Sequence, residues 1–162
     1  MPCGNTAVPK PVPPVKQALA EYLASSGAAA IGLPEWEAIR RRFPATSAGY
    51  LRRLVRQAGL PLAPLVEGVR QDSAAELERT LLALQAEYSA ADPAGRQACR
   101  RLVIEAKDHA RLSLRRSSPD KAAPRREAMQ WMIVWLENPA AFPAWLRLRK
   151  KTLASPAPPA DE

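Results

Sequence analysis

The sequence is short of the residues that build metal cages. It has only two cysteines, Cys3 and Cys99, and one histidine, His109, among 162 residues. A structural zinc site takes four cysteine or histidine ligands as a rule. The shortage therefore excludes a Cys/His zinc cage built from one chain, and we expect no metal site. A chain of this length is long enough to fold without metal or disulfide staples.

Long apolar segments are also missing. No hydrophobic run approaches the roughly 20 residues that a membrane-spanning helix requires. The first residues, Met1 to Asn5, show neither a charged region nor an apolar region of the kind that begins an export signal. The composition therefore predicts a soluble, cytoplasmic protein.

Glycine is scarce as well, with seven residues, and none of them forms a phosphate-binding or nucleophile motif. The patterns G-x-x-x-x-G-K-[ST], G-x-G-x-x-G and G-x-S-x-G do not occur. Glu105 and His109 lie one helical turn apart, a spacing that can bind metal or form a general base. No nucleophile completes such a mechanism, so we favour a half-buried, hydrogen-bonded histidine and expect no enzyme, catalytic residue or cofactor.

Residues that favour β-strands are few. Val, Ile and Thr together occur 16 times, against 31 alanines and 19 leucines. Alanine and leucine favour helices, whereas β-branched residues favour the pleated surface of a sheet. The fold class predicted is all-α: a helix-turn-helix-like N-terminal unit packed with a C-terminal bundle of about four helices.

Apolar residues at helical spacing and the caps between them place the expected helices. Ser73 and Glu76 form a capping-box pattern, and Asp92 precedes a first-turn proline. A polar, basic break is expected at 115–126. The expected helices cover residues 15–31, 34–43, 47–58, 72–91, 94–116 and 127–138, with a short one after 138–139; the segment 65–71 is left unassigned.

Proline, with 17 residues, is abundant, and eight prolines lie near the two ends. Segments rich in proline favour flexible or polyproline II structure. We therefore expect flexible tails at 1–14 and 152–162, a helix-turn-helix-like unit at 15–71 and a helical bundle at 72–151. The connection between the two units is short and partly apolar, which is also consistent with one shared core.

The spacing within residues 34–59 is that of a helix-turn-helix, in which the second helix enters the major groove of DNA. One face of the second helix is apolar, with Leu51, Leu54 and Val55, and includes Ser47 and Ala58. In outline the arrangement resembles the three-helix core of bacterial DNA-binding domains. The resemblance implies duplex DNA as a partner. The candidate nucleic-acid-binding residues are Ser47, Gly49, Tyr50, Arg52, Arg53 and Arg56.

A structural interpretation of the same features stays open. Any helix pair in a bundle has this layout, and a GC-rich genome places arginine wherever a basic residue suffices. The acidic segment 67–92 lies between basic segments, with six acidic and two basic side chains. Its charges either keep one basic face free for phosphates or pair with the neighbouring helix 94–116 through surface ion bridges.

The last feature is a tryptophan-rich segment followed by the basic end Arg147–Lys151, which could contact phosphate or an anionic membrane. Three tryptophans fall within 15 residues: Trp131, Trp135 and Trp145. They either complete the core or bind a second copy or a protein partner. Two function hypotheses result: a non-enzymatic nucleic-acid-binding protein of regulatory type, or a helical interaction protein with a tryptophan-rich surface.

Overall fold

A computed structural model of the chain describes residues 14–155, and the predicted all-α class is confirmed. Over these residues there is no β-strand, and only one isolated bridge joins Ile31 to Leu62. The α-helices are α1 (Val15–Ser26), α2 (Leu33–Arg42), α3 (Ala48–Gln57), α4 (Ala74–Ala90), α5 (Pro93–Arg115), α6 (Pro119–Glu137) and α7 (Phe142–Ala154), and the short 3₁₀ turns are η1 (Pro64–Glu67) and η2 (Pro139–Ala141).

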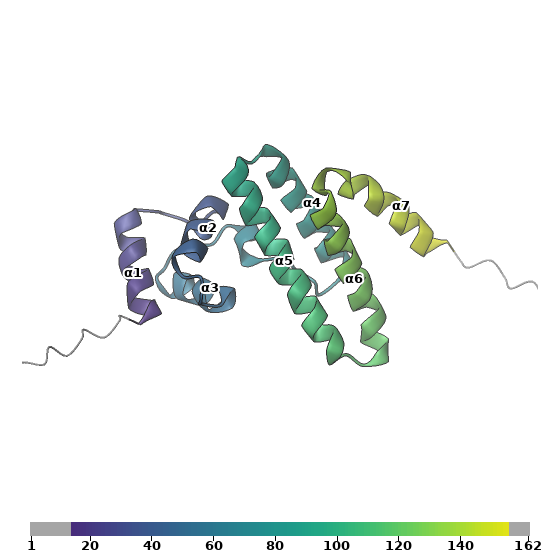
Figure 1. The fold of residues 1–162 in the computed structure, drawn as a ribbon, viewed down its shortest axis with the longest axis horizontal. Coiled ribbons are helices and arrows are strands. Elements are labelled where there is room, and N and C mark those ends of the chain that lie inside the picture. The colour runs from purple at the N-terminus through teal and green to yellow at the C-terminus, as the bar shows by residue number, and fades with distance from the viewer. Residues whose placement is uncertain (1–13, 156–162) are drawn as a thin grey trace, which may run out of the picture.

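The helices form an arched molecule in which α5 is central (Figure 1). The antiparallel hairpin of α5 and α6 is the largest helix–helix contact, and α4 and α2 also pack against α5. Helices α1, α2 and α3 form a lobe at one end, here called the N-terminal lobe (residues 15–57), and α7 lies at the other end (Figure 1). The buried apolar side chains form one cluster that runs from α1 to α7.

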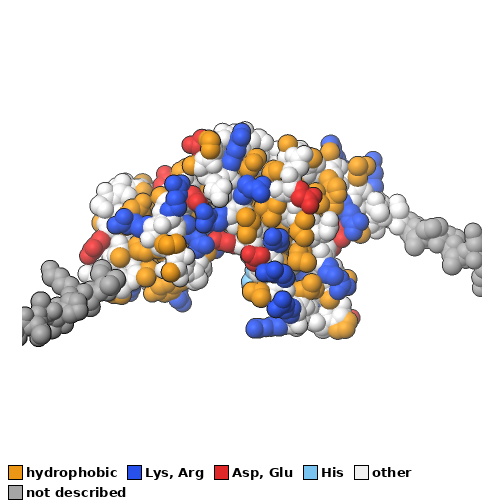
Figure 2. All heavy atoms as spheres, in the orientation of Figure 1, with side chains coloured by type: hydrophobic (Ala, Val, Ile, Leu, Met, Phe, Trp, Pro, Cys, Tyr) orange, Lys and Arg blue, Asp and Glu red, His pale blue; other side chains and the backbone are white. Residues whose placement is uncertain are grey.

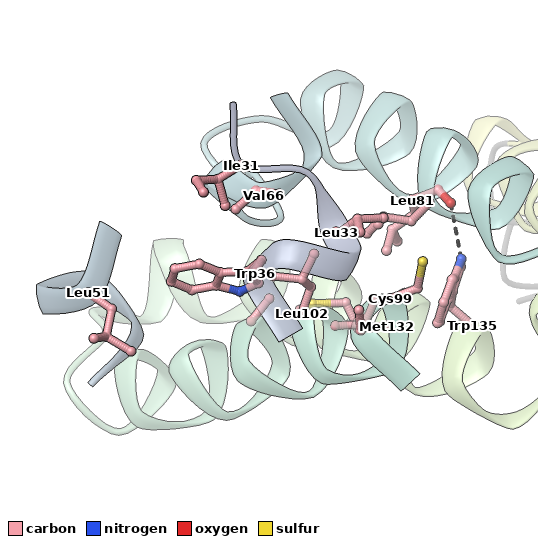
Figure 3. Packing of buried hydrophobic residues seen from close by; sticks show 14 of the residues in the cluster. Ile31, Leu33, Trp36, Leu51, Val66, Leu81, Cys99, Leu102, Met132 and Trp135 are labelled. Atoms are coloured by element: carbon pink, nitrogen blue, oxygen red, sulfur yellow. Dashed lines mark hydrogen bonds between the residues drawn. The ribbon is translucent and has the colours of Figure 1, made fainter. Parts of the chain in front are cut away.

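Trp36 and Trp135 are the largest fully buried side chains in this core. Trp135 donates a hydrogen bond from its indole Nε1 to the Leu81 carbonyl at 3.0 Å, which joins α6 to α4 (Figure 3). The thiol of Cys99 is buried near this pair, and burial raises its pKa to about 11 because the low-dielectric interior disfavours the thiolate. The hydrogen bond from Trp135 to Leu81 satisfies the buried indole N–H and removes the cost of burying this polar group without a partner.

Two helix boundaries differ from the sequence prediction by five residues or more, and glycine and proline explain both. Helix α1 ends at Ser26 rather than at 31, because Gly27 adopts the left-handed conformation with φ 66°. Helix α6 begins at Pro119 rather than at 127, so the predicted break shrinks to residues 116–118. Pro124 lies in the second turn of α6, where its missing N–H removes only one bond of the helix ladder.

The ends of the described chain also refine the expectations for the tails. Helix α7 continues to Ala154, into the segment 152–162 that we expect to be a tail. The rest of both expected tails, residues 1–13 and 156–162, lies outside the described residues. No helix within residues 14–155 combines the length and the apolar character needed to cross a bilayer.

Ion pairs do not join the acidic helix α4 to its basic neighbour α5 in the described part of the chain, although sequence favoured such pairs. Glu78 of α4 instead accepts from Lys150 of α7 at 3.0 Å. Ion pairs join α5 to α2 instead: Arg101 of α5 lies 3.0 Å from Glu37, and Arg40 of α2 reaches Glu105 of α5. The charge complementarity therefore connects the bundle to α7 and to the N-terminal lobe.

Candidate nucleic-acid interface

Helices α2 and α3 are joined by the turn 43–47, which is longer than the three residues that the sequence predicts. The amide of Thr46 donates to the Phe43 carbonyl at 3.2 Å, and the hydroxyl of Ser47 caps α3 by accepting from the Tyr50 amide at 3.3 Å. Leu51, with its apolar neighbours Leu54 and Val55, buries the inner side of α3 as predicted, whereas Ser47 and Ala58 are exposed.

The outer side of α3 is open to solvent at five of the six residues predicted from sequence. We call these residues the α3 patch: Ser47, Gly49, Tyr50, Arg53 and Arg56. The guanidinium of Arg53 lies over the Tyr50 ring, with its Cζ 5.1 Å from the ring centroid. A Cβ atom added at Gly49 would meet no atom within 4 Å, so the first turn of the helix is unobstructed.

Arg56 belongs to this face but is partly neutralised. Its side chain is 54% exposed, and Nη2 lies 3.6 Å from Glu67 Oε1. Arg70 also approaches Glu67, at 3.2 Å. Because one carboxylate serves two arginines at the surface, their cluster keeps a net positive charge. An exposed pair of this kind is weak and easily exchanged for another anion.

Arg52 does not share the exposed face, and the expectation that all three arginines of α3 are exposed is wrong. Its side chain is 15% exposed, and its Nε donates to the Val66 carbonyl at 2.7 Å. Glu105 lies 3.7 Å from its Nη2. The pKa of the Arg52 guanidinium is lowered because the side chain is buried, and the nearby Glu105 carboxylate offsets part of this shift by raising the pKa. Arg52 therefore anchors α3 to η1 and α5.

The junction between α2 and α5 contains a second internal ion pair. The side chain of Glu37 is 2% exposed; its Oε1 lies 3.0 Å from Arg101 Nη2 and 3.8 Å from Arg41 Nε. Its Oε2 atom has no hydrogen-bond partner within the described residues. No signal in the sequence predicts these contacts, because helix spacing alone does not tell which charged side chain meets a neighbouring helix.

The tryptophans are mostly core residues, so Trp131 and Trp135 do not form a partner surface. Trp131 is 4% exposed and Trp135 is fully buried. The indole of Trp131 donates to Glu127 at 3.0 Å. Only Trp145 is half-buried, stacked on Phe142 with ring centroids 6.2 Å apart. The core alternative is therefore confirmed for two of the three tryptophans.

His109 is exposed rather than half-buried, and it makes no hydrogen bond to the described part of the chain. Its predicted neighbour Glu105 is directed toward Arg40 and Arg52 instead. Within residues 14–155, no group of three or more His, Cys, Asp or Glu side chains is arranged to hold a metal ion. Glu105 therefore serves the junction between α5 and the N-terminal lobe, and His109 is left without the carboxylate partner that the spacing suggested.

Comparisons of the chain with protein-family models, with curated proteins and with solved structures found no match. The geometry of the α3 patch and the charges around it are therefore the observations that bear on function.

Proposed function

We propose that the protein binds duplex nucleic acid through the α3 patch, with phosphate groups as the principal contacts. The observation that carries this proposal is the position of Arg53: it is exposed, it forms no ion pair in the described chain, and it lies on the helix that follows the turn 43–47. Its guanidinium has donors arranged to bind a phosphate or a guanine edge in a bidentate manner.

The N-terminal turn of α3 supports the same contact. The first amide groups of a helix have no acceptor within the helix, and the helix dipole favours an anion there. Ser47 satisfies the Tyr50 amide, and the amides of Ala48 and Gly49 precede it in the same turn. Because Gly49 has no side chain, a phosphate group can approach this turn closely.

The burial of Arg52 lowers the expected number of phosphate contacts. Two arginines of α3 remain for binding, Arg53 and Arg56. Each phosphate that is neutralised contributes about −0.9 to the slope of log K against log salt concentration. The α3 patch should therefore contribute a slope of about −2 in a plot of log K against log salt concentration.

Binding of a labelled duplex of about 20 base pairs, titrated over a range of salt concentrations, tests this proposal. The variant R53Q/R56Q should lose the slope contributed by the patch. The matched control is R79Q/R147Q, since both arginines are exposed, form no ion pair in the described chain and lie on other helices. Equal slopes for R53Q/R56Q and the control would reject α3 as the binding element.

A second candidate function, a protein-binding role, is favoured by the exposed apolar side of α7. Leu148 is 66% exposed and, with the half-buried Trp145, lines a shallow groove between α6 and α7. Exposed apolar side chains gathered in this way are typical of partner surfaces. Light scattering on the wild-type protein and on L148S tests whether this surface joins two copies of the chain, and an unchanged monomer mass would reject self-association.

A further inference from the structure

The turn between α5 and α6, together with the flanking ends of the two helices, carries a strong excess of positive charge. We call residues 111–126 the hairpin tip; they include six basic side chains and one acidic side chain, Asp120. The exposed cations of the tip are Arg111, Arg115, Arg116, Lys121 and Arg126. Figure 2 shows Lys and Arg side chains gathered over these ends of α5 and α6.

Most of these cations have no partner within the described residues. Arg111 lies 3.8 Å from Asp108. The other four exposed cations form no ion pair within the described residues: Arg115, Arg116, Lys121 and Arg126. Elsewhere some cations are paired, as Arg149 is with Glu127 at 2.6 Å, and others, such as Arg53 and Arg79, form no ion pair in the described chain. The tip therefore concentrates unpaired positive charge, which costs free energy through mutual repulsion.

Local stability accounts for only part of this charge. Arg115 and Arg116 lie at the C-terminal end of α5, where the helix dipole favours cations. Lys121 lies in the first turn of α6, where the dipole disfavours a cation, and Arg126 lies one turn further on. The charges on the α6 side are therefore not explained by helix stabilisation.

The tip is held in one shape by Arg125, the one basic residue there that is directed inward. Its Nη1 donates to the Ser113 carbonyl at 3.1 Å and also to the Ser117 hydroxyl. The Ser117 hydroxyl in turn donates to the Ser113 carbonyl at 2.7 Å. These bonds fix the start of α6 against the end of α5, so the exposed cations are presented on a rigid frame.

We propose that the hairpin tip is a second phosphate-binding surface that contacts the backbone of the same duplex as the α3 patch. This proposal deepens the proposed function and rests on it. Lys and Arg side chains lie both over the N-terminal lobe and over the tip on the face shown in Figure 2, and the outline is hollowed between them. A duplex presents phosphates on both sides of its grooves, so two separated basic surfaces on one face suit it.

Four proteins separate the contributions of the two surfaces in a salt titration with a duplex of about 20 base pairs. They are the wild type, the patch variant R53Q/R56Q, the tip variant R115Q/R116Q/K121Q/R126Q, and a control variant, K16Q/R79Q/R147Q/K151Q. The control removes the same number of exposed cations as the tip variant from other helices. Since all of these side chains are exposed, circular dichroism should show unchanged folding in each variant.

We expect the slope of log K against log salt concentration to become shallower by about 3 in the tip variant and by less than 1 in the control. Equal slopes for the tip variant and the control would overturn the proposal, and so would a wild-type protein that does not bind the duplex at low salt. Loss of slope in the patch variant alone leaves the proposed function standing and rejects the tip. Loss in the tip variant alone rejects the α3 patch, and with it the proposal that both surfaces contact one duplex. Vesicles that contain phosphatidylserine form a further arm: tip-dependent binding to vesicles without binding to the duplex would reject nucleic acid as the partner.

Discussion

The guanidinium of Arg52 lies over the indole ring of Trp36, with Cζ 5.0 Å from the ring centroid. The same side chain donates to the Val66 carbonyl. Arg52 thus joins α3 to the buried tryptophan of α2 and to the η1 turn, whereas its neighbour Arg53 is exposed. Two adjacent arginines on one helix therefore have different roles.

The first prediction concerns these two arginines. Arg52→Ala should lower the free energy of unfolding by about 2 kcal/mol, because it removes a charge-assisted hydrogen bond and a cation–π contact. Arg53→Ala should change it by less than about 0.5 kcal/mol, as expected for an exposed side chain. Urea denaturation of both variants measures the difference. Similar unfolding midpoints for the two would contradict the structural role of Arg52.

The second prediction concerns the buried carboxylate of Glu37. Arg101→Ala should destabilise the protein by about 2 kcal/mol, a value reduced from that of a fully buried pair because Arg101 is partly exposed. Arg111→Ala, which removes an exposed pair with Asp108, serves as the control and should cost less than about 1 kcal/mol. Thermal unfolding of the two variants provides the comparison, and equal midpoints would show that the Glu37 pair contributes no more than a surface pair.

The third prediction is a pH dependence that originates at Glu127. Hydrogen bonds from Arg149, and to a smaller extent from Trp131, lower the pKa of this carboxyl below 4.5. A lowered pKa in the folded state stabilises the protein above the unfolded pKa, and this contribution is lost as the pH falls through the folded value. Glu127→Gln should therefore be less stable than the wild type at pH 7. The difference should shrink as the pH is lowered below about 4, and unfolding midpoints across this range test it; a constant difference would contradict the assignment.

The fourth prediction concerns the thiol of Cys99. Burial, and then the charge of Glu87, raise its pKa from 9.0 to about 11. At pH 8 only about one in a thousand of these thiols is ionised, so a thiol reagent should react slowly with the folded Cys3→Ser variant. Reaction should become fast in urea, where the thiol is exposed. Fast reaction in buffer alone would contradict the burial of Cys99.

The same pKa shift has a consequence at alkaline pH. The raised pKa stabilises the folded state below pH 9, and this stability is lost as the pH rises through about 11. Cys99→Ala should lose less stability over this interval than the wild type. Unfolding midpoints of the two proteins measured across it provide the comparison, and parallel decreases would contradict a contribution from the thiol.

The local signals in the sequence predicted where several helices begin. Ser73 accepts from the Glu76 amide at 3.2 Å and Asp92 from the Gly95 amide at 2.8 Å, which confirms both caps. The reciprocal half of the capping box is absent at Ser73 and occurs instead where the Gly32 amide donates to Glu35 at 3.1 Å. Caps depend on residues three positions apart, so the sequence contains most of the information that sets them.

The sequence could not tell which charged side chains turn inward. Arg52 and Arg53 are consecutive in the sequence, and which of them turns inward is decided by Val66 and by Glu105, which are distant in the chain. The tryptophans illustrate the same limit, because the apolar side of α6 that carries Trp135 is covered by α4. Contacts between distant segments decide burial, and helical periodicity does not contain them.

The short bridge between Ile31 and Leu62 has a consequence for how the molecule opens. The Ile31 amide donates to the Pro61 carbonyl and the Ala63 amide donates to the Ile31 carbonyl, each at 2.9 Å. These two bonds close a ring of chain that contains α2 and α3. Local unfolding of this ring would break both bonds together, so the hydrogen-exchange rates of these two amides should report the free energy of that local unfolding step.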